Sequence, residues 1–475
     1  MLVKDLAEKA NVKFGTSGVR GLVDDLSPEV CYAYTAAFIS LYSSAKFIAI
    51  GHDLRPSSPM IARACIAAAK AFGVEVEYLG ALPTPTIAHF CIHKEMPGLV
   101  VTGSHIPFDR NGIKFYRADG EISKNDEESI SNSIVELPED INLEGHLPVT
   151  NKGGLEFYLD RYVGFFGASF LLGKTIAIYE HSSVARDVLH RVFRSLGAST
   201  ISLGRSDVFV PIDTEAVRDE DIKMGIEWSK EYPFDMLVST DGDADRPLIA
   251  GEDGIWLRGD VVGVLTSKYL KMTHVVTPVS SNTALERSGF FNSVTRTKIG
   301  SPFVIDAMNE LSKDQSSKVC GYEANGGFLL QSNLEQNNKV LSALPTRDAI
   351  LPMLAIMGMS IESQMPISKL PDELPTRFTH SDRIQDFSHE KSQDLLTHRL
   401  VDDESIISIL LPSAKSVVDK NLVDGLRVTF ETGDILHIRP SGNAPELRCY
   451  SESSSITRAK ELCDEALGRI ARFCQ

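Results

Sequence analysis

Three aspartates follow a predicted strand at alternate positions. The segment STDGDADRP (239–247) places Asp241, Asp243 and Asp245 directly after an apolar stretch. In an extended segment the side chains at i, i+2 and i+4 point the same way, so these carboxylates converge and repel one another unless a cation compensates. Carboxylate oxygens suit Mg²⁺ or Ca²⁺. A calcium loop of the EF-hand type is disfavoured because its sixth position is Arg246 rather than glycine and a strand precedes it. A solvated acidic turn is the other interpretation.

A serine in a polar loop is the candidate nucleophile. The segment VVTGSHIPFDRNGIKFY (100–116) begins as an apolar strand and continues into a loop with Ser104 and His105, followed by Lys114. Ligands bind at strand ends in α/β units, and a serine beside a base and a cation has the parts of an activated nucleophile. The alternative is a turn serine that bonds only to local backbone groups.

A glycine-rich segment, CGYEANGGF (320–328), has groups suited to sugar hydroxyls. Its glycines allow the backbone to approach a ligand closely, and Glu323 and Asn325 offer hydrogen bonds. The alternative is a glycine-rich turn with a solvated acid.

The segment IRPSGNAPELR (438–448) has groups suited to a phosphate. Arg439 and Arg448 carry planar guanidinium groups that match phosphate oxygens. Ser441 and the turn around Asn443 could complete an anion nest. The alternative is a tight hairpin with surface arginines.

Short apolar strands alternate with amphipathic helices along most of the chain, which predicts α/β layers with mainly parallel pairing. A helix capped by Ser57 is expected to bury Phe72, and another is expected from about Thr346 to Met359. Strands are predicted at 46–51, 98–101, 175–179, 236–240 and 274–278.

The pattern predicts three similar mixed α/β domains followed by a smaller α+β domain. The C-terminal part differs because three closely spaced strands (GLRVTFE, ILHIRPS and LRCYSES) precede an amphipathic helix. A linker is expected at 365–376, where the last domain would hinge. The predicted domains are residues 1–152 with the serine loop, 153–254 with the aspartate loop, 255–366 with the glycine-rich loop and 367–475 with the arginine loop.

Composition narrows the class of protein. A chain of 475 residues is too long for one compact core, so several domains are expected. The net charge of -16 argues against a general nucleic-acid binder, which would show a basic face. Seven cysteines without a CxxC pair suggest neither a disulfide framework nor a zinc site. The N-terminus lacks an apolar signal core and no apolar run is long enough to span a membrane, so a reduced, cytoplasmic location is expected.

These motifs, taken together and in order, resemble the α-D-phosphohexomutase superfamily, which includes phosphomannomutases and phosphoglucomutases. The resemblance covers nearly the whole chain. It also includes KFGTSGVRG (13–21), Asp53-Leu54-Arg55 and Pro83-Thr84-Pro85. It implies a heart-shaped arrangement of four domains, each with one active-site loop. The implied activity interconverts a hexose 1-phosphate and a hexose 6-phosphate through phosphoserine and a 1,6-bisphosphate, which also acts as activator.

The resemblance also implies a role for each candidate residue. Ser104 would carry the phosphoryl group, with His105, Lys114 and Arg20 around it. Mg²⁺ would be held by Asp241, Asp243, Asp245 and an oxygen of phospho-Ser104. Arg246 would lie near the substrate, Glu323 and Asn325 would bind the sugar, and Arg439, Ser441, Asn443 and Arg448 would bind the phosphate that is not transferred.

The sequence departs from the usual family pattern in places. Ile106 stands where the serine loop commonly has asparagine, and Asn443 and Ala444 stand where threonine and glutamate are frequent. Because the other charged groups remain, altered affinity rather than lost function is expected. Asn325 stands where many bacterial relatives have serine, which weakens an inference about the sugar.

Several alternatives stay open. His105 or Lys114 could be the general acid and base. Mannose is the first candidate sugar, with glucose, glucosamine and N-acetylglucosamine as alternatives. A sugar phosphatase and a non-catalytic binding protein are further possibilities. The protein is expected to be a monomer or homodimer with small hexose phosphates as its partners.

Overall fold

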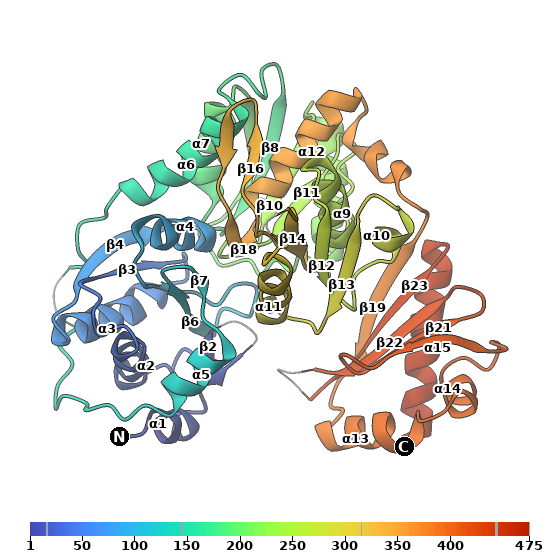
Figure 1. The fold of residues 1–475 in the computed structure, drawn as a ribbon, viewed down its shortest axis with the longest axis horizontal. Coiled ribbons are helices and arrows are strands. Elements are labelled where there is room, and N and C mark those ends of the chain that lie inside the picture. Colours follow the sequence, from blue (N-terminus) through green and yellow to red (C-terminus); the bar gives the residue numbers. More distant parts are fainter. Residues whose placement is uncertain (16–17, 144–145, 315, 442–444, 475) are drawn as a thin grey trace.

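The computed structural model of the chain describes residues 1–15, 18–143, 146–314, 316–441 and 445–474. The chain forms an arch in which the first and last sheets make the two lower lobes and the second and third sheets lie between them (Figure 1). Three mixed α/β units and a C-terminal α+β unit follow one another, as predicted. The boundaries at 152, 254 and 366 stay predictions.

The first three sheets repeat one plan. Parallel strands form one part of each sheet, and antiparallel strands extend it on one side, so pairing is less uniformly parallel than predicted. The first sheet contains β1 (Lys13–Phe14), β2 (Val19–Leu22), β3 (Phe47–His52), β4 (Glu75–Ala81), β5 (Gly98–Val101), β6 (Arg110–Arg117) and β7 (Gly120–Glu121) in the order β1-β2-β6-β5-β3-β4, with β7 on β6. The second contains β8 (Thr175–His181), β9 (Ser199–Arg205), β10 (Met236–Thr240) and β11 (Pro247–Ala250) in the order β11-β10-β8-β9.

The third sheet follows the same plan and the fourth does not. The third contains β12 (His274–Pro278), β13 (Ser293–Thr297), β14 (Val319–Tyr322), β15 (Phe328–Leu330) and β18 (Leu344–Asp348) in the order β13-β12-β14-β15-β18, beside a hairpin of β16 (Leu334–Gln336) and β17 (Lys339–Leu341). The fourth is antiparallel and contains β19 (Phe378–Ile384), β20 (Val417–Asn421), β21 (Leu426–Phe430), β22 (Ile435–Pro440) and β23 (Leu447–Ser453) in the order β19-β23-β22-β21-β20. Two of these strands, β19 and β20, were not predicted.

This plan places the candidate loops. In each of the first three sheets, a parallel strand ends, a polar loop follows, and the chain returns as an antiparallel strand beside it. The serine loop joins β5 to β6, the aspartate loop joins β10 to β11, and the glycine-rich loop joins β14 to β15. The arginine loop joins β22 to β23 in the fourth sheet.

Helices pack against the sheets (Figure 1). They are α1 (Val3–Lys9), α2 (Pro28–Ser40), α3 (Ser58–Ala71), α4 (Thr84–Lys94), α5 (Lys124–Ser131), α6 (Gly153–Phe166), α7 (Arg186–Ser195), α8 (Asp219–Glu231), α9 (Gly259–Tyr269), α10 (Ala284–Arg287), α11 (Ser301–Leu311), α12 (Ile350–Ser363), the 3₁₀ helix η1 (Ile367–Glu373), α13 (His389–Asp394), the π-helical turn η2 (Leu395–Arg399), α14 (Asp403–Leu410) and α15 (Ile456–Phe473). Within the described ranges, no single helix is long and apolar enough to cross a membrane, although α12 and η1 meet that test as a pair bent by 83°.

Three local predictions are wrong. The Ser57 side chain makes no cap bond to α3, and its hydroxyl instead accepts a hydrogen bond from Asn111 Nδ2 at 2.8 Å. Phe72 lies past the end of that helix and is 45% exposed. Thr346 belongs to β18, because residues 344–348 pair with β15, and α12 begins only at Ile350.

The segment predicted as a linker, 365–376, is not an open tether. It contains η1, and Ile367, Leu370 and Leu374 are buried in the apolar core of the preceding units. A hinge in this segment would therefore have to expose apolar side chains.

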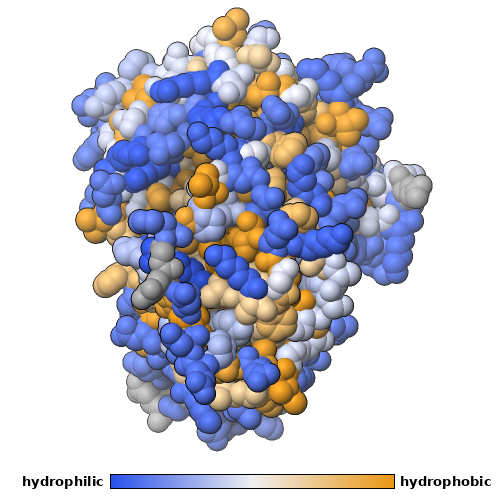
Figure 2. Space-filling model, turned by 90° about the vertical axis from the view of Figure 1, so that its left-hand side faces the viewer, coloured by the Kyte–Doolittle hydropathy of each residue, from blue (hydrophilic) through white to orange (hydrophobic). Residues whose placement is uncertain are grey.

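One apolar core runs through the first three units, whereas the fourth unit has its own. The shared core includes Leu79 of β4, Phe193 of α7 and Tyr322 of β14, while Phe430 and Leu462 lie in a separate cluster in the fourth unit. Hydrophilic and hydrophobic residues are interspersed on the face of the molecule shown in Figure 2.

Contacts between the third and fourth units include polar ones. The Glu452 carboxylate accepts hydrogen bonds from the Thr283 backbone N–H, at 3.1 Å, and from the Thr283 hydroxyl. The Ile299 N–H donates to Asp424 Oδ2 at 3.1 Å. Because burying apolar surface is the dominant favourable contribution to folding, we expect the fourth unit to unfold separately from the other three.

Scanning calorimetry tests this division. Phe430→Ala and Phe193→Ala each remove a fully buried ring and should each destabilise by about 3–5 kcal/mol. We expect two transitions, with Phe430→Ala lowering the midpoint of one and Phe193→Ala lowering the other. A single transition lowered by both substitutions would show that the four units unfold together.

Candidate active site

The serine loop is clamped by one arginine. The Arg55 guanidinium is buried and donates to four backbone carbonyl oxygens of the loop at 2.5–3.0 Å, those of Ser104, Ile106, Pro107 and Arg110. Asp53 lies 3.3 Å from Arg55 Nε and also accepts hydrogen bonds from the Thr102 hydroxyl and the Gly103 N–H. The motif Asp53-Leu54-Arg55 therefore shapes the loop that presents the serine.

The backbone of Ser104 has a conformation that residues other than glycine seldom adopt. Its φ is 53°, in the left-handed region, which costs energy for a residue other than glycine and is found where the surrounding structure holds the backbone. Gly103 allows this loop to lie against the clamp, because an added Cβ would lie 2.4 Å from Arg55 Cζ. The serine loop therefore packs directly against the Arg55 side chain.

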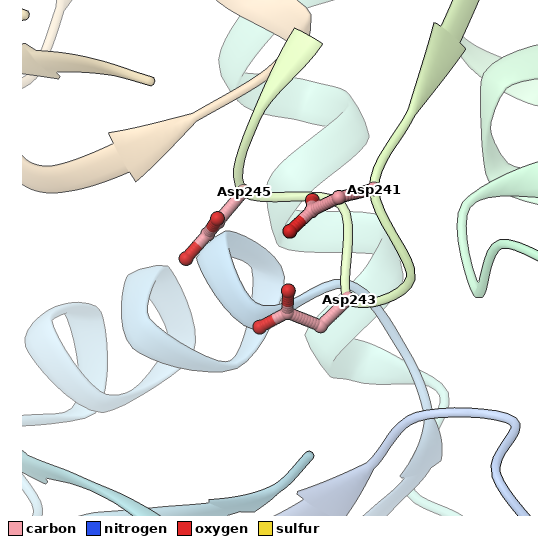
Figure 3. A group of neighbouring side chains, drawn as sticks. All are labelled: Asp241, Asp243 and Asp245. Atoms are coloured by element: carbon pink, nitrogen blue, oxygen red, sulfur yellow. The ribbon is translucent and has the colours of Figure 1, made fainter. Parts of the chain in front are cut away.

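The three aspartates extend from one loop toward a common space (Figure 3). All are buried, and one oxygen from each carboxylate lies within 4.8 Å of the others. The geometry behind this convergence differs from the prediction. Residues 241–246 form a turn rather than an extended strand, and Ala244 has a φ of 60°.

The aspartate loop and the serine loop meet directly. Ser104 Oγ donates to Asp241 Oδ2 at 2.7 Å. Gly242 makes this approach possible, since an added Cβ would lie 2.7 Å from the Ser104 carbonyl oxygen. Two segments far apart in the sequence therefore place a hydroxyl group inside a carboxylate cluster.

Groups from other units stabilise the buried carboxylates. Lys114 Nζ lies 2.7 Å from Asp243 Oδ2 and 2.6 Å from Asp245 Oδ2. The Thr84 hydroxyl donates to the same Asp243 oxygen at 2.6 Å. Burial opposes ionisation of Asp243, but Lys114 and Thr84 hold the pKa of that carboxyl below its ordinary value.

The donor set fits a hard divalent cation. Oδ1 of Asp243 and Oδ1 of Asp245 are buried without a hydrogen-bond partner, and such groups are costly unless something compensates them. Burial raises the pKa of Asp241 well above its usual range, and the neighbouring carboxylates raise it further. A cation bound by these oxygens would relieve both penalties, and carboxylate oxygens are the ligands that Mg²⁺ prefers.

His105 lies beside the serine but is held by an arginine. Its Nδ1 is 3.4 Å from Ser104 Oγ and 3.0 Å from Arg246 Nη1. Because a guanidinium can only donate, Nδ1 accepts this hydrogen bond and the imidazole is neutral. Burial lowers the pKa of His105 well below its usual range, and Arg246 and Arg20 lower it further. Arg20 itself donates to the Gly103 carbonyl oxygen at 2.8 Å.

The glycine-rich loop faces the same cluster through an arginine that was not predicted. Glu323 is buried and its Oε2 lies 3.0 Å from Arg347 Nη1. Arg347 also contacts Asp245 Oδ2 through Nη2 at 2.9 Å. The Asn325 side-chain oxygen accepts from the Gly327 N–H at 2.9 Å, so this oxygen shapes the loop. A lone arginine in this segment carries no motif, which is why it was missed.

The arginine loop is described in part, and Asn443 lies outside the described residues. Arg439 Nε is 3.2 Å from Asp424 Oδ2, and Arg448 Nη2 is 3.6 Å from Glu446 Oε2. Ser441 is buried, and its N–H donates to the Glu446 carbonyl oxygen at 2.8 Å.

Glu215, which was also not predicted, relates this loop to the others. Burial and Asp213 raise the pKa of Glu215, while Arg246, Arg258 and Arg448 act to lower it. These arginines come from the second, third and fourth units, and all three act on the Glu215 carboxyl. No local sequence signal marks Glu215, since it lies in a loop without a motif.

Family models match three parts of the chain. The models described as phosphoglucomutase/phosphomannomutase alpha/beta/alpha domain I, alpha/beta/alpha domain III and C-terminal domain match residues 11–140, 258–378 and 400–468. The chain belongs to the phosphoglucomutase/phosphomannomutase family. It is thereby placed in the α-D-phosphohexomutase superfamily, as predicted.

Full-length relatives agree with this assignment. The chain is 45% identical over 469 residues to a phosphomannomutase of Salmonella muenchen, covering 98% of this chain and 97% of that protein. It is 41% identical over 465 residues to a phosphomannomutase of Sinorhizobium fredii, covering 96% and 98%. A solved structure of a phosphoglucomutase/phosphomannomutase family protein from Burkholderia thailandensis has the same fold, with a TM-score of 0.74, 18% identity and 97% of each chain covered.

Gly103→Ala tests the clamp on the serine loop. The new Cβ would collide with Arg55 and displace charged hydrogen bonds, each contributing about 1.5–3 kcal/mol, so we expect urea unfolding to show a loss of about 2 kcal/mol or more. Gly164→Ala is the control, because a Cβ there meets nothing within 4 Å and replaces glycine inside a helix. Equal effects of the two substitutions would contradict the clamp.

Cation binding by the aspartates is tested by thermal unfolding with MgCl₂ or with EDTA. Mg²⁺ at about 100 times its dissociation constant should stabilise the wild type by about 2.7 kcal/mol. Asp243→Asn should lose this stabilisation, whereas Glu335→Gln, at an exposed acid outside the cluster, should keep it. Equal stabilisation of Asp243→Asn and wild type would place the cation elsewhere.

Proposed function

We propose that the protein is a phosphohexomutase, an isomerase that interconverts hexose 1-phosphate and hexose 6-phosphate with Ser104 as the phosphoryl carrier. The observation that carries this proposal is the hydrogen bond from Ser104 Oγ to Asp241 inside the buried aspartate cluster. Membership of the phosphoglucomutase/phosphomannomutase family supports it. Mg²⁺ would be held by Asp241, Asp243, Asp245 and phospho-Ser104, and would neutralise charge on the phosphoryl oxygens.

The reaction consists of two transfers. The 6-hydroxyl of a hexose 1-phosphate attacks the phosphorus of phospho-Ser104, the bond from phosphorus to Ser104 Oγ breaks, and the hydroxyl proton leaves to a base. The resulting 1,6-bisphosphate turns round in the site. Ser104 Oγ then attacks the phosphorus of the C1 phosphate, the bond from that phosphorus to the C1 oxygen breaks, the C1 oxygen takes up the proton that the base received, and hexose 6-phosphate leaves. The same bisphosphate can phosphorylate an unmodified Ser104, which makes it an activator.

Positioning and charge neutralisation are the main tasks of the protein in phosphoryl transfer. We infer that Lys114, whose ammonium already faces two aspartates, neutralises charge on the transferring group. Arg20 and Arg246 add positive charge around Ser104, and Glu323 binds ring hydroxyls. The phosphate that is not transferred would be bound by Arg439, Ser441, Asn443 and Arg448.

The assignment of the general base has two candidates. His105 Nδ1 already accepts a hydrogen bond from Arg246, which favours a positioning role for His105. Lys114 is the other candidate and would first have to release its proton. If His105 is the base, His105→Ala should reduce kcat by about 10²–10⁴-fold, measured in a coupled assay. Retention of most of kcat would leave Lys114 as the candidate.

Mannose phosphates are the proposed substrates. Two relatives named phosphomannomutase match this chain over nearly its full length at 45% and 41% identity, which supports this choice over glucose and N-acetylglucosamine.

Phosphorus NMR tests the activity and the sugar together. Purified protein with MgCl₂ receives mannose, glucose or N-acetylglucosamine 1-phosphate, each with a trace of the corresponding 1,6-bisphosphate. We expect the 6-phosphate signal to grow fastest with mannose, and Ser104→Ala to give no conversion because the phosphoryl carrier is absent. Release of inorganic phosphate in place of the isomer would instead identify a phosphatase, and equal conversion by Ser104→Ala would exclude the phosphoserine route.

A further inference from the structure

Arg347 connects two of the loops without belonging to either. It lies at the end of β18 and is buried. Its Nε and Nη2 lie 3.0 and 2.9 Å from Asp245 Oδ2, and its Nη1 lies 3.0 Å from Glu323 Oε2. One guanidinium therefore bridges a carboxylate proposed to hold the cation and a carboxylate proposed to bind the sugar.

Neighbouring contacts fix the position of Arg347. The next residue, Asp348, accepts hydrogen bonds from the hydroxyls of Tyr158, at 2.6 Å, and Tyr162. The stem of Arg347 packs over the glycine-rich loop, because an added Cβ at Gly327 would lie 2.6 Å from Arg347 Cδ. The position of the guanidinium is thus set by the third sheet and by α6.

The position of Glu323 depends on this contact. Glu323 is only 3% exposed. Removing the positively charged partner of a buried carboxylate strongly destabilises the folded protein. For Glu323 this partner is the Arg347 guanidinium, which lies at a fixed place. On the other side of the bridge, Arg347 and Lys114 both contact Oδ2 of Asp245, while Oδ1 is buried without a hydrogen-bond partner.

We propose that Arg347 is a positioning residue for sugar recognition, which holds the Glu323 carboxylate at a fixed place relative to the aspartate cluster. This inference rests on the proposed function. A ring hydroxyl that bonds to Glu323 is then placed relative to Ser104 as well, so recognition of the hydroxyl and alignment of the 6-hydroxyl depend on the same guanidinium.

Lysine cannot replace this arrangement. A guanidinium presents donors in a planar fork, whereas an ammonium is a compact charge on a flexible stem. A lysine side chain at this position would keep the charge but could not span both carboxylates in the observed geometry. Arg347→Lys therefore separates the bridging function from the charge.

The experiment compares the fastest natural hexose 1-phosphate with its monodeoxy analogues, each lacking one ring hydroxyl, by kcat/KM. A site built to hydrogen-bond a hydroxyl rejects the analogue without it, so the wild type should lose about tenfold or more with at least one analogue. In Arg347→Lys and in Glu323→Gln this penalty should fall below about threefold. The double variant Glu323→Gln/Arg347→Lys should lose no more than either single variant, because both act on one contact.

Arg377→Lys is the matched control, since Arg377 is a buried arginine paired with Glu452 away from the aspartate cluster. Arg377→Lys should keep the full deoxy penalty. If any weakened buried ion pair reduced the penalty, Arg377→Lys and Arg347→Lys would both show the reduction.

If Arg347→Lys does not fold, Glu323→Gln/Arg347→Met, which removes both charges, takes its place and should show the same reduced penalty. A full deoxy penalty in Arg347→Lys, or no penalty in the wild type, would overturn the inference. Both of these results require an active wild type. Failure of the proposed function is different, because the wild type would then show no turnover on any hexose phosphate.

Discussion

The structure depends on three carboxylates that are buried close together. Asp241, Asp243 and Asp245 could not share this space as free charges, because like charges in a poorly solvated environment repel strongly. Arg246 of the same loop lies near Asp241 and Asp245, but the closest cationic groups come from other units, Lys114 from the first and Arg347 from the third. The Thr84 hydroxyl, also from the first unit, adds a hydrogen bond to Asp243. The same contacts that compensate the carboxylates therefore also fix the relative positions of three units.

The repeated sheet plan makes this possible. A parallel strand brings the chain to one edge of the sheet, and an antiparallel return leaves a short loop there. Such edges are the usual ligand sites of α/β units. Three units with this plan, joined by one apolar core, bring the three loops together, while polar contacts such as those of Glu452 and Asp424 join the fourth unit to the third. A fourth unit with its own apolar core would suit the proposed reaction, in which an intermediate must reorient in the site.

Much of this could be predicted from the sequence, for physical reasons. The strands at 98–101, 236–240 and 274–278 are buried on both faces except at His274, so their apolar residues stand next to one another instead of alternating with polar ones. The aspartate triplet was found because its chemistry is local, although its carboxylates converge through the left-handed Ala244 turn and not through an extended strand. Arg55, Arg347 and Glu215 were missed or given no role because their partners lie far away in the chain. The end of the strand Leu344–Asp348, from about Thr346, was assigned to the following helix because its strand character depends on pairing with β15.

The central claim is that Ser104 carries the phosphoryl group between two positions of one sugar. Incubation with hexose 1,6-bisphosphate labelled with ³²P, followed by peptide mapping, tests this directly. We expect label on the peptide that contains Ser104. Added hexose 1-phosphate should then take up this label, first as bisphosphate and then as 6-phosphate. Label that is absent from this peptide, or that stays on it when hexose 1-phosphate is added, would contradict the account.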